Sequence, residues 1–178
     1  MINKMLYHVC LLPAKEDKLI LENIIKSLAE KYNSYPFLAH MTIYSRIPTS
    51  EAIVIKAVKE SLSGIKPFQI EVDKLDYSDL FTKTLYIQFK NNPTLKKIYS
   101  SLFNNLNKYV DYTFNPHMSL IYKNNMPFEE KEKIITNIKL NRRVIFDRCV
   151  IIGATKLLKE EKDVTDWQIA FEKDLNQN

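Results

Sequence analysis

The chain has 178 residues, of which 46% are hydrophobic and 26% charged, a composition typical of a globular protein with a substantial core. No apolar run approaches the roughly 20 residues of a membrane span, and the N-terminal MINKMLYHVCLLPAKEDK turns polar too early for a signal peptide, so a cytoplasmic protein is expected. The net charge of +5 is the difference between 26 Lys and Arg and 21 Asp and Glu residues. The basic residues are scattered, which argues against a nucleic-acid-binding tail and leaves open an acidic ligand or an ordinary solvated surface.

Hydrophobic periodicity and turn residues predict five elements in the first half of the chain. They are a strand over about 5–12, a helix over about 16–31, a strand that carries HMTI, a helix from Thr49 or Ser50 to about 63, and a strand over about 67–76. Proline in the segment YPF favours an extended approach to HMTI, and Gly64 ends the second helix.

The second half predicts the same order of elements. A strand over 84–90 precedes a helix that Asn92-Pro93 opens and that runs to about 109, then the extended YTFNPHMSLIY, a helix over about 127–139, a strand over 143–152 and a strand over about 166–172 that pairs back as a hairpin. Similarity at a long period indicates a duplicated architecture. We therefore expect one domain over 1–178 with motif-bearing halves, roughly 1–83 and 84–178, related by a pseudo-two-fold axis.

Two of the three histidines in the chain begin the same four-residue pattern, HMTI at His40 and HMSL at His117. On a β-strand, residues i and i+2 point to the same face, so His40 shares a face with Thr42 and His117 shares one with Ser119. The hydrophobic residues between and after them turn toward the core. If the two motif strands meet, they line a cleft with two imidazoles and two hydroxyls.

This set of side chains suits phosphodiester cleavage. The reaction needs a base for the attacking oxygen and an acid for the leaving oxygen, and the unperturbed histidine pKa near 6.5 serves both roles. Hydroxyls can donate hydrogen bonds to the non-bridging phosphate oxygens, where negative charge develops. A lone histidine or threonine on a strand is usually structural, but that explanation does not account for a matched pair in matched halves.

The doubled H-x-[ST]-hydrophobic pattern resembles that of the two-histidine phosphoesterase superfamily, over essentially the whole chain. This superfamily includes RNA 2′,3′-cyclic phosphodiesterases and bacterial enzymes once named 2′-5′ RNA ligases. The chain looks most like the compact cyclic phosphodiesterases, through LLP at 11–13, YPFLAHMTI around the first motif and the aromatic Tyr122 in HMSLIY. The resemblance implies an α+β fold of two lobes, each a mainly antiparallel sheet with outer helices, and motifs that face a central groove.

The resemblance also implies roles for individual residues. His40 and His117 would be the acid–base pair, with His117 activating water and His40 protonating the leaving oxygen. Thr42 and Ser119 would hold the phosphate, and Tyr122 would line the substrate pocket. It implies nucleoside 2′,3′-cyclic phosphates or ADP-ribose 1″,2″-cyclic phosphate as substrates. No metal or cofactor is expected, because the two histidines supply the acid and the base, and a monomer is the default expectation.

Two alternatives stay open. The same site could cleave 2′-5′ oligoadenylates, cyclic oligonucleotides or RNA ends, and loops 76–83 and 122–128 would then set the pocket length. A non-catalytic RNA- or nucleotide-binding module would use the positive charge and the aromatic residues of the strand TLYIQFK. Lys123 is the nearest match to the basic residue of larger RNA-processing relatives, and its weak match favours a small nucleotide.

The remaining distinctive residues are interpreted as structural. Cys10 and Cys149 lie in apolar strands and are expected to be buried free thiols. His8 alternates with apolar residues, which favours a core histidine satisfied by one hydrogen bond. Trp167 is expected to pack the last strand against its lobe. The chain has only two glycines and neither a GxGxxG nor a GKT loop, which argues against an ATP-driven enzyme of those classes.

Overall fold

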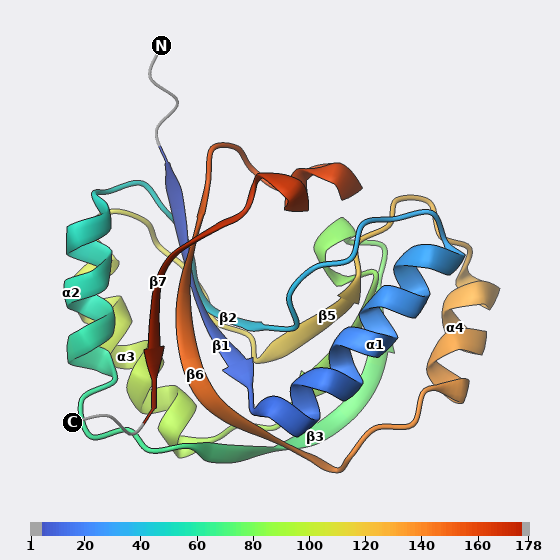
Figure 1. The fold of residues 1–178 in the computed structure, drawn as a ribbon, viewed down its shortest axis with the longest axis horizontal. Coiled ribbons are helices and arrows are strands. Elements are labelled where there is room, and N and C mark those ends of the chain that lie inside the picture. The colour runs from blue at the N-terminus through green and yellow to red at the C-terminus, as the bar shows by residue number, and fades with distance from the viewer. Residues whose placement is uncertain (1–4, 176–178) are drawn as a thin grey trace.

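Seven strands and four α-helices make up the computed structural model of the chain, which describes residues 5–175 (Figure 1). In chain order they are β1 (Leu6–Pro13), α1 (Lys15–Lys31), β2 (Met41–Ile47), α2 (Glu51–Ser61), β3 (Phe68–Tyr77), β4 (Leu85–Phe89), α3 (Pro93–Leu106), β5 (His117–Ile121), α4 (Phe128–Asn137), β6 (Arg143–Ala154) and β7 (Gln168–Asp174). Two short 3-10 helices, Phe81–Lys83 and Glu161–Asp166, complete the described chain. The predicted α+β class is confirmed.

Most elements form where the local signals predict them. Asn92 caps α3, because its side chain accepts hydrogen bonds from the first two free backbone N–H groups of the helix. The second motif strand is shorter than predicted and starts at His117. Pro116 precedes it and has no N–H to contribute to a strand ladder, so the chain before it does not pair as a strand. The last two strands form the predicted antiparallel pair.

The strands pair antiparallel in the order β2-β1-β6-β3-β4-β5, and β7 pairs with β6. The long strand β6 joins the two parts of the sheet, since its residue Phe146 pairs with Pro13 of β1 and with Phe68 of β3. The motif strands β2 and β5 stand at opposite ends of this order, yet they contact each other. The sheet therefore curves until its two ends meet.

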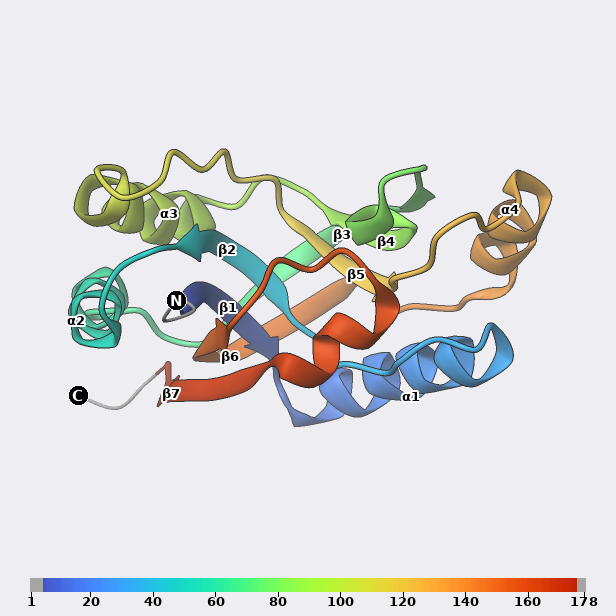
Figure 2. The ribbon, with the colours of Figure 1, turned by 90° about the horizontal axis from the view of Figure 1, so that it is seen from above.

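The helices interleave the two halves of the sequence. Figures 1 and 2 show α2 and α3 at one end of the sheet and α1 and α4 at the other, so each end has one helix from each half. Helices α2 and α3 pack together, and α1 packs against β5, the motif strand of the other half. The two halves of the sequence therefore repeat the order of their elements, but each end of the sheet is covered by helices from both halves. In the described part of the chain, no helix is long and apolar enough to cross a membrane.

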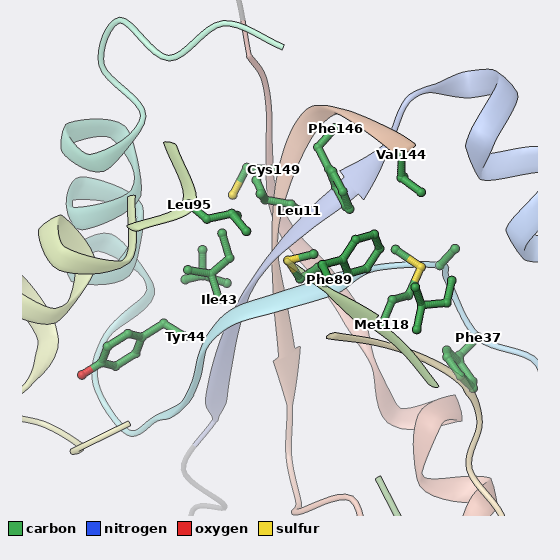
Figure 3. Packing of buried hydrophobic residues seen from close by; sticks show 14 of the residues in the cluster. Leu11, Phe37, Ile43, Tyr44, Phe89, Leu95, Met118, Val144, Phe146 and Cys149 are labelled. Atoms are coloured by element: carbon green, nitrogen blue, oxygen red, sulfur yellow. The ribbon is translucent and has the colours of Figure 1, made fainter. Parts of the chain in front are cut away.

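The core fills the space between the curved sheet and its helices (Figure 3). The hydrophobic motif residues Met41, Ile43, Met118 and Leu120 are fully buried, as strand alternation predicts. Close packing of this kind fixes the strand faces, because a shift of one residue would bring every core side chain to the solvent.

Both cysteines lie in this interior as free thiols. Burial raises the pKa of Cys10 to about 12 and also raises that of Cys149. Neither thiol is therefore a thiolate near neutral pH, and their prediction as buried free thiols is confirmed.

Candidate active site

One cavity of about 440 Å³ brings together all five residues that the sequence singles out: His40, Thr42, His117, Ser119 and Tyr122. It lies where β2 and β5 meet, and each motif supplies one histidine and one hydroxyl. His117 is the first residue of β5, whereas His40 directly precedes β2. Such a volume is within the range of small-molecule sites.

The two histidines make the same hydrogen bond. Nδ1 of His40 lies 2.6 Å from the carbonyl oxygen of Leu38, and Nδ1 of His117 lies 2.8 Å from that of Asn115. A carbonyl oxygen can only accept, so Nδ1 carries the hydrogen in each ring and donates it. The Nε2 atoms are then left to exchange protons with a ligand. This shared geometry places both rings in the tautomer that an acid–base pair requires.

Local sequence explains why both carbonyl groups lie within reach. Each accepting residue comes two positions before its histidine, in an extended segment that contains a proline, Pro36 or Pro116. Proline fixes φ and keeps the residue before it out of the helical region, so these segments remain extended up to the start of β2 and β5.

The hydroxyl groups face the same cavity with different partners. Ser119 Oγ donates to the carbonyl oxygen of Thr82 at 2.7 Å, while Thr42 Oγ1 lies 3.6 Å from Cys10 Sγ. Hydroxyl hydrogens rotate freely, so either group can redirect its hydrogen to a ligand oxygen. The Ser119 hydroxyl would exchange one acceptor for another when it does so.

Aromatic side chains pack against the His40 ring. Trp167 meets the His40 ring edge-on, with ring centroids 5.5 Å apart and planes at 82°. Phe37 stacks on Tyr122 at 4.2 Å and meets His40 at 6.2 Å. Trp167, which the sequence predicts only as a packing residue of the last strand, thus also contacts a candidate catalytic ring. Edge-to-face contacts of this kind restrict how a ring can turn.

The electrostatic surroundings favour neutral imidazoles. Burial lowers the pKa of His40 most, the charge of His117 lowers it further, and the bond to Leu38 partly opposes the shift. Burial also lowers the pKa of His117, and the ammonium of Lys83 adds to this effect, against the bond to Asn115. A buried cation is costly without a counter-charge, which a phosphate ligand would supply.

Sequence reasoning missed several residues that line this cavity. His8 is half-buried and makes one hydrogen bond, 2.7 Å to Ser45 Oγ, as expected of a structural histidine, but it also lines the cavity beside Arg46. Thr82 lines the cavity and comes from the loop 76–83, which was expected to shape the pocket. The segment 157–159 also lines the cavity, although no sequence pattern predicted it. These residues reach the cavity through the tertiary fold, which no local pattern reveals.

Lys123 does not line the cavity: its Nζ lies 3.3 Å from the Asn33 carbonyl oxygen and 3.5 Å from Glu161. Three histidines line the cavity, but across residues 5–175 no three His, Cys, Asp or Glu side chains are grouped so that they could hold a metal ion.

Comparison with known proteins identifies relatives along most of the chain. Residues 14–163 match the model of the 2′-5′ RNA ligase superfamily. The chain is 20% identical to a cyclic phosphodiesterase of Arabidopsis thaliana over 186 aligned positions, which cover 98% of each protein. It is 25% identical over 142 positions to BH1439 of Halalkalibacterium halodurans, whose name assigns it provisionally to the phosphoesterases; this covers 76% of the chain and 80% of the relative.

The fold agrees with the same assignment. The crystal structure of Escherichia coli LigT in its apo form superimposes with a TM-score of 0.61 at 13% identity, covering 97% of this chain and 98% of LigT. A crystal structure described as a phosphoesterase gives a TM-score of 0.62, covering 98% and 99% of the two chains, also at 13% identity. The resemblance to the two-histidine phosphoesterases and the fold that it implied are confirmed, and the chain belongs to the 2′-5′ RNA ligase superfamily.

Proposed function

We propose that this protein is a phosphodiesterase that opens cyclic phosphodiesters to phosphomonoesters by acid–base catalysis with His40 and His117, without a metal ion. The observation that carries the proposal is the matched geometry of the two rings, each with Nδ1 bound to a backbone carbonyl and Nε2 left for proton transfer. The superfamily assignment and relatives named phosphoesterase and cyclic phosphodiesterase support phosphoester hydrolysis.

The proposed step adds one water molecule across a P–O bond. Nε2 of one neutral ring takes a proton from the water as its oxygen attacks phosphorus. The protonated second ring gives its Nε2 proton to the ribose oxygen as the P–O bond to it breaks. We assign His117 as the base, because it is more exposed than His40 and water can reach it, and His40 as the acid. Thr42 and Ser119 donate to the non-bridging oxygens.

The substrate in this proposal is a nucleoside 2′,3′-cyclic phosphate or ADP-ribose 1″,2″-cyclic phosphate. The cavity volume of about 440 Å³ suits one nucleotide. Crystal structures of LigT with 3′-AMP and with ATP are consistent with small nucleotide ligands in this fold. Cleavage of 2′-5′ linked or cyclic oligonucleotides would use the same chemistry. If the protein leaves a panel of linear 2′-5′ oligomers intact, cleavage of 2′-5′ linked oligonucleotides is excluded.

The deciding experiment is hydrolysis of adenosine 2′,3′-cyclic phosphate and ADP-ribose 1″,2″-cyclic phosphate in excess EDTA, followed by phosphorus NMR. We expect turnover to a monoester at the same rate with and without EDTA. Loss of activity in EDTA that Zn²⁺ or Mn²⁺ restores would contradict the metal-independent mechanism. Tight nucleotide binding without turnover of any substrate would favour the binding-module alternative.

The pH dependence of kcat/KM is expected to be bell-shaped, with its maximum below pH 6.5. Catalysis requires one ring neutral and the other protonated. Burial lowers both pKa values, so in the free protein both limbs of the profile lie below the usual histidine value: activity falls at higher pH as the pair loses its one proton and at lower pH as it gains a second. The measurement is kcat/KM between pH 4.5 and 8.5. A constant rate from pH 5 to 8 would contradict paired histidine catalysis.

Lys83 provides a specific control on this profile. Its charge lowers the pKa of His117, so Lys83→Gln is expected to move the His117 limb to higher pH. The ammonium lies 4.0 Å from the centroid of the Tyr86 ring, which itself meets His117 edge-on. If the pH profile of this variant is unchanged, its limbs report the ionisation of groups other than His117.

A further inference from the structure

The pairing of β1 with β2 contains a bulge beside the catalytic motif. There, one residue of β1, His8, lies opposite two consecutive residues of β2, Ser45 and Arg46. A regular strand would turn Ser45 and Arg46 to opposite faces, yet both line the cavity. Arg46 has a φ of 58°, in the left-handed region that residues other than glycine, asparagine and aspartate rarely adopt. Strained residues of this kind gather at functional sites.

The charge of the cavity is one-sided. Arg46 and Lys159 both line it, and no carboxylate does. Within residues 5–175, neither cation forms an ion pair with an acidic side chain, although eleven other ion pairs are present. The planar guanidinium of an arginine without a counter-charge in a concave site fits an anion that can accept two hydrogen bonds, such as a phosphate.

The His8–Ser45 pair adds a neutral donor to this charge. Burial, and then the charges of His40 and Arg46, lower the pKa of His8 to about 4, so its ring is neutral near pH 7. A neutral imidazole has one N–H and serine has one O–H, and their mutual hydrogen bond of 2.7 Å uses one of the two. One donor hydrogen therefore remains for a ligand, whichever tautomer His8 adopts.

We propose that Arg46 and the His8–Ser45 pair bind a second phosphate group of the substrate, apart from the phosphodiester held between His40 and His117. The inference rests on the proposed function and narrows it: the preferred substrate is a cyclic phosphodiester that carries a further phosphate or diphosphate. A plain nucleoside 2′,3′-cyclic phosphate would leave these donors and the guanidinium without an acceptor.

The test compares kcat/KM for adenosine 2′,3′-cyclic phosphate with kcat/KM for the same nucleotide carrying a 5′-phosphate. The unmodified protein is expected to prefer the 5′-phosphorylated substrate by at least about tenfold, because charge-assisted hydrogen bonds to phosphate are strong. The preference should shrink as salt is added. An equal kcat/KM for the two substrates would overturn the inference, while turnover of both would leave the proposed function intact.

Two variants of Arg46 separate its charge from its backbone. Asparagine tolerates the left-handed conformation, so Arg46→Asn removes the guanidinium without new strain and is expected to reduce the preference to about twofold or less. Arg46→Lys keeps a positive charge and is expected to retain part of the preference. A preference that survives in Arg46→Asn would contradict the inference, since the second phosphate would then be bound elsewhere.

Binding of product-like probes decides the matter even if neither substrate turns over. Calorimetric titration would compare adenosine 3′-monophosphate with adenosine 3′,5′-bisphosphate, and inorganic phosphate would be titrated separately. We expect the unmodified protein to bind the bisphosphate at least about tenfold more tightly than the monophosphate. Arg46→Asn is expected to lack this difference in affinity. Equal affinities would overturn the inference. Tight binding of inorganic phosphate that Arg46→Asn abolishes, with no gain for the bisphosphate, would also contradict a substrate role.

Discussion

Replacing either His40 or His117 by alanine is expected to lower kcat by about 10²- to 10⁴-fold, the usual contribution of one general acid or base. Each ring reaches the cavity with its Nε2 free, because Nδ1 is engaged by a backbone carbonyl. The double variant should lose much less than the product of the two single losses, since acid and base act in one proton-transfer step. The measurement is single-turnover hydrolysis of adenosine 2′,3′-cyclic phosphate by each variant.

Asparagine variants test whether the loss comes from chemistry or from structure. Asparagine can keep a donor to the carbonyl of Leu38 or Asn115 but has no titratable nitrogen. We expect His40→Asn and His117→Asn to unfold at nearly the same temperature as the unmodified protein while remaining as inactive as the alanine variants. Activity within tenfold of the unmodified protein in either asparagine variant would contradict acid–base catalysis at that position.

The Phe146→Ala variant is expected to lower the free energy of unfolding by about 3–5 kcal/mol, the usual cost of emptying a large aromatic site in a core. Phe146 is fully buried at the point where β6 pairs with both β1 and β3 (Figure 3). Its ring contacts Phe89 at 5.8 Å and Phe68 at 6.3 Å between centroids. In a chain of this length, the loss corresponds to a fall in Tm of about 6–20 °C.

Phe128→Ala is the matched control, since it makes the same chemical change at a side chain that is 58% exposed. Its ring contacts Tyr77 edge-on and fills no enclosed volume that the structure would have to leave empty. We expect a loss of at most about 1 kcal/mol. Urea unfolding followed by circular dichroism would measure both variants. Similar losses in the two would show that the junction at Phe146 does not carry the stability assigned to it.

Local periodicity was sufficient to place the motif side chains. In a strand the side-chain period is two residues, so HMTI and HMSL could be assigned to a cavity face and a core face without knowing the partner strands. The structure confirms that Met41 and Met118 are buried. The helix start at Asn92-Pro93 was equally predictable, because a cap satisfies backbone groups within the same few residues.

The substrate-facing details depended on contacts between distant segments. Only the curved strand order brings β2 and β5 together, and only the pairing of β1 with β2 places His8 opposite Ser45 and Arg46. A bulge is a property of two strands in register, so no periodicity within one strand predicts it. The same holds for Trp167, which meets His40 across more than a hundred residues of chain.

Residue type and local spacing were thus enough to tell which side chains share a strand face and which chemistry they suit. How the curved sheet brings the two motifs to one cavity, how the helices of the two halves interleave around it and why a strained arginine lies at its side follow from contacts that no local pattern contains. The physical reason is that sheet curvature, register and bulges are set by pairing and packing between segments far apart in the chain.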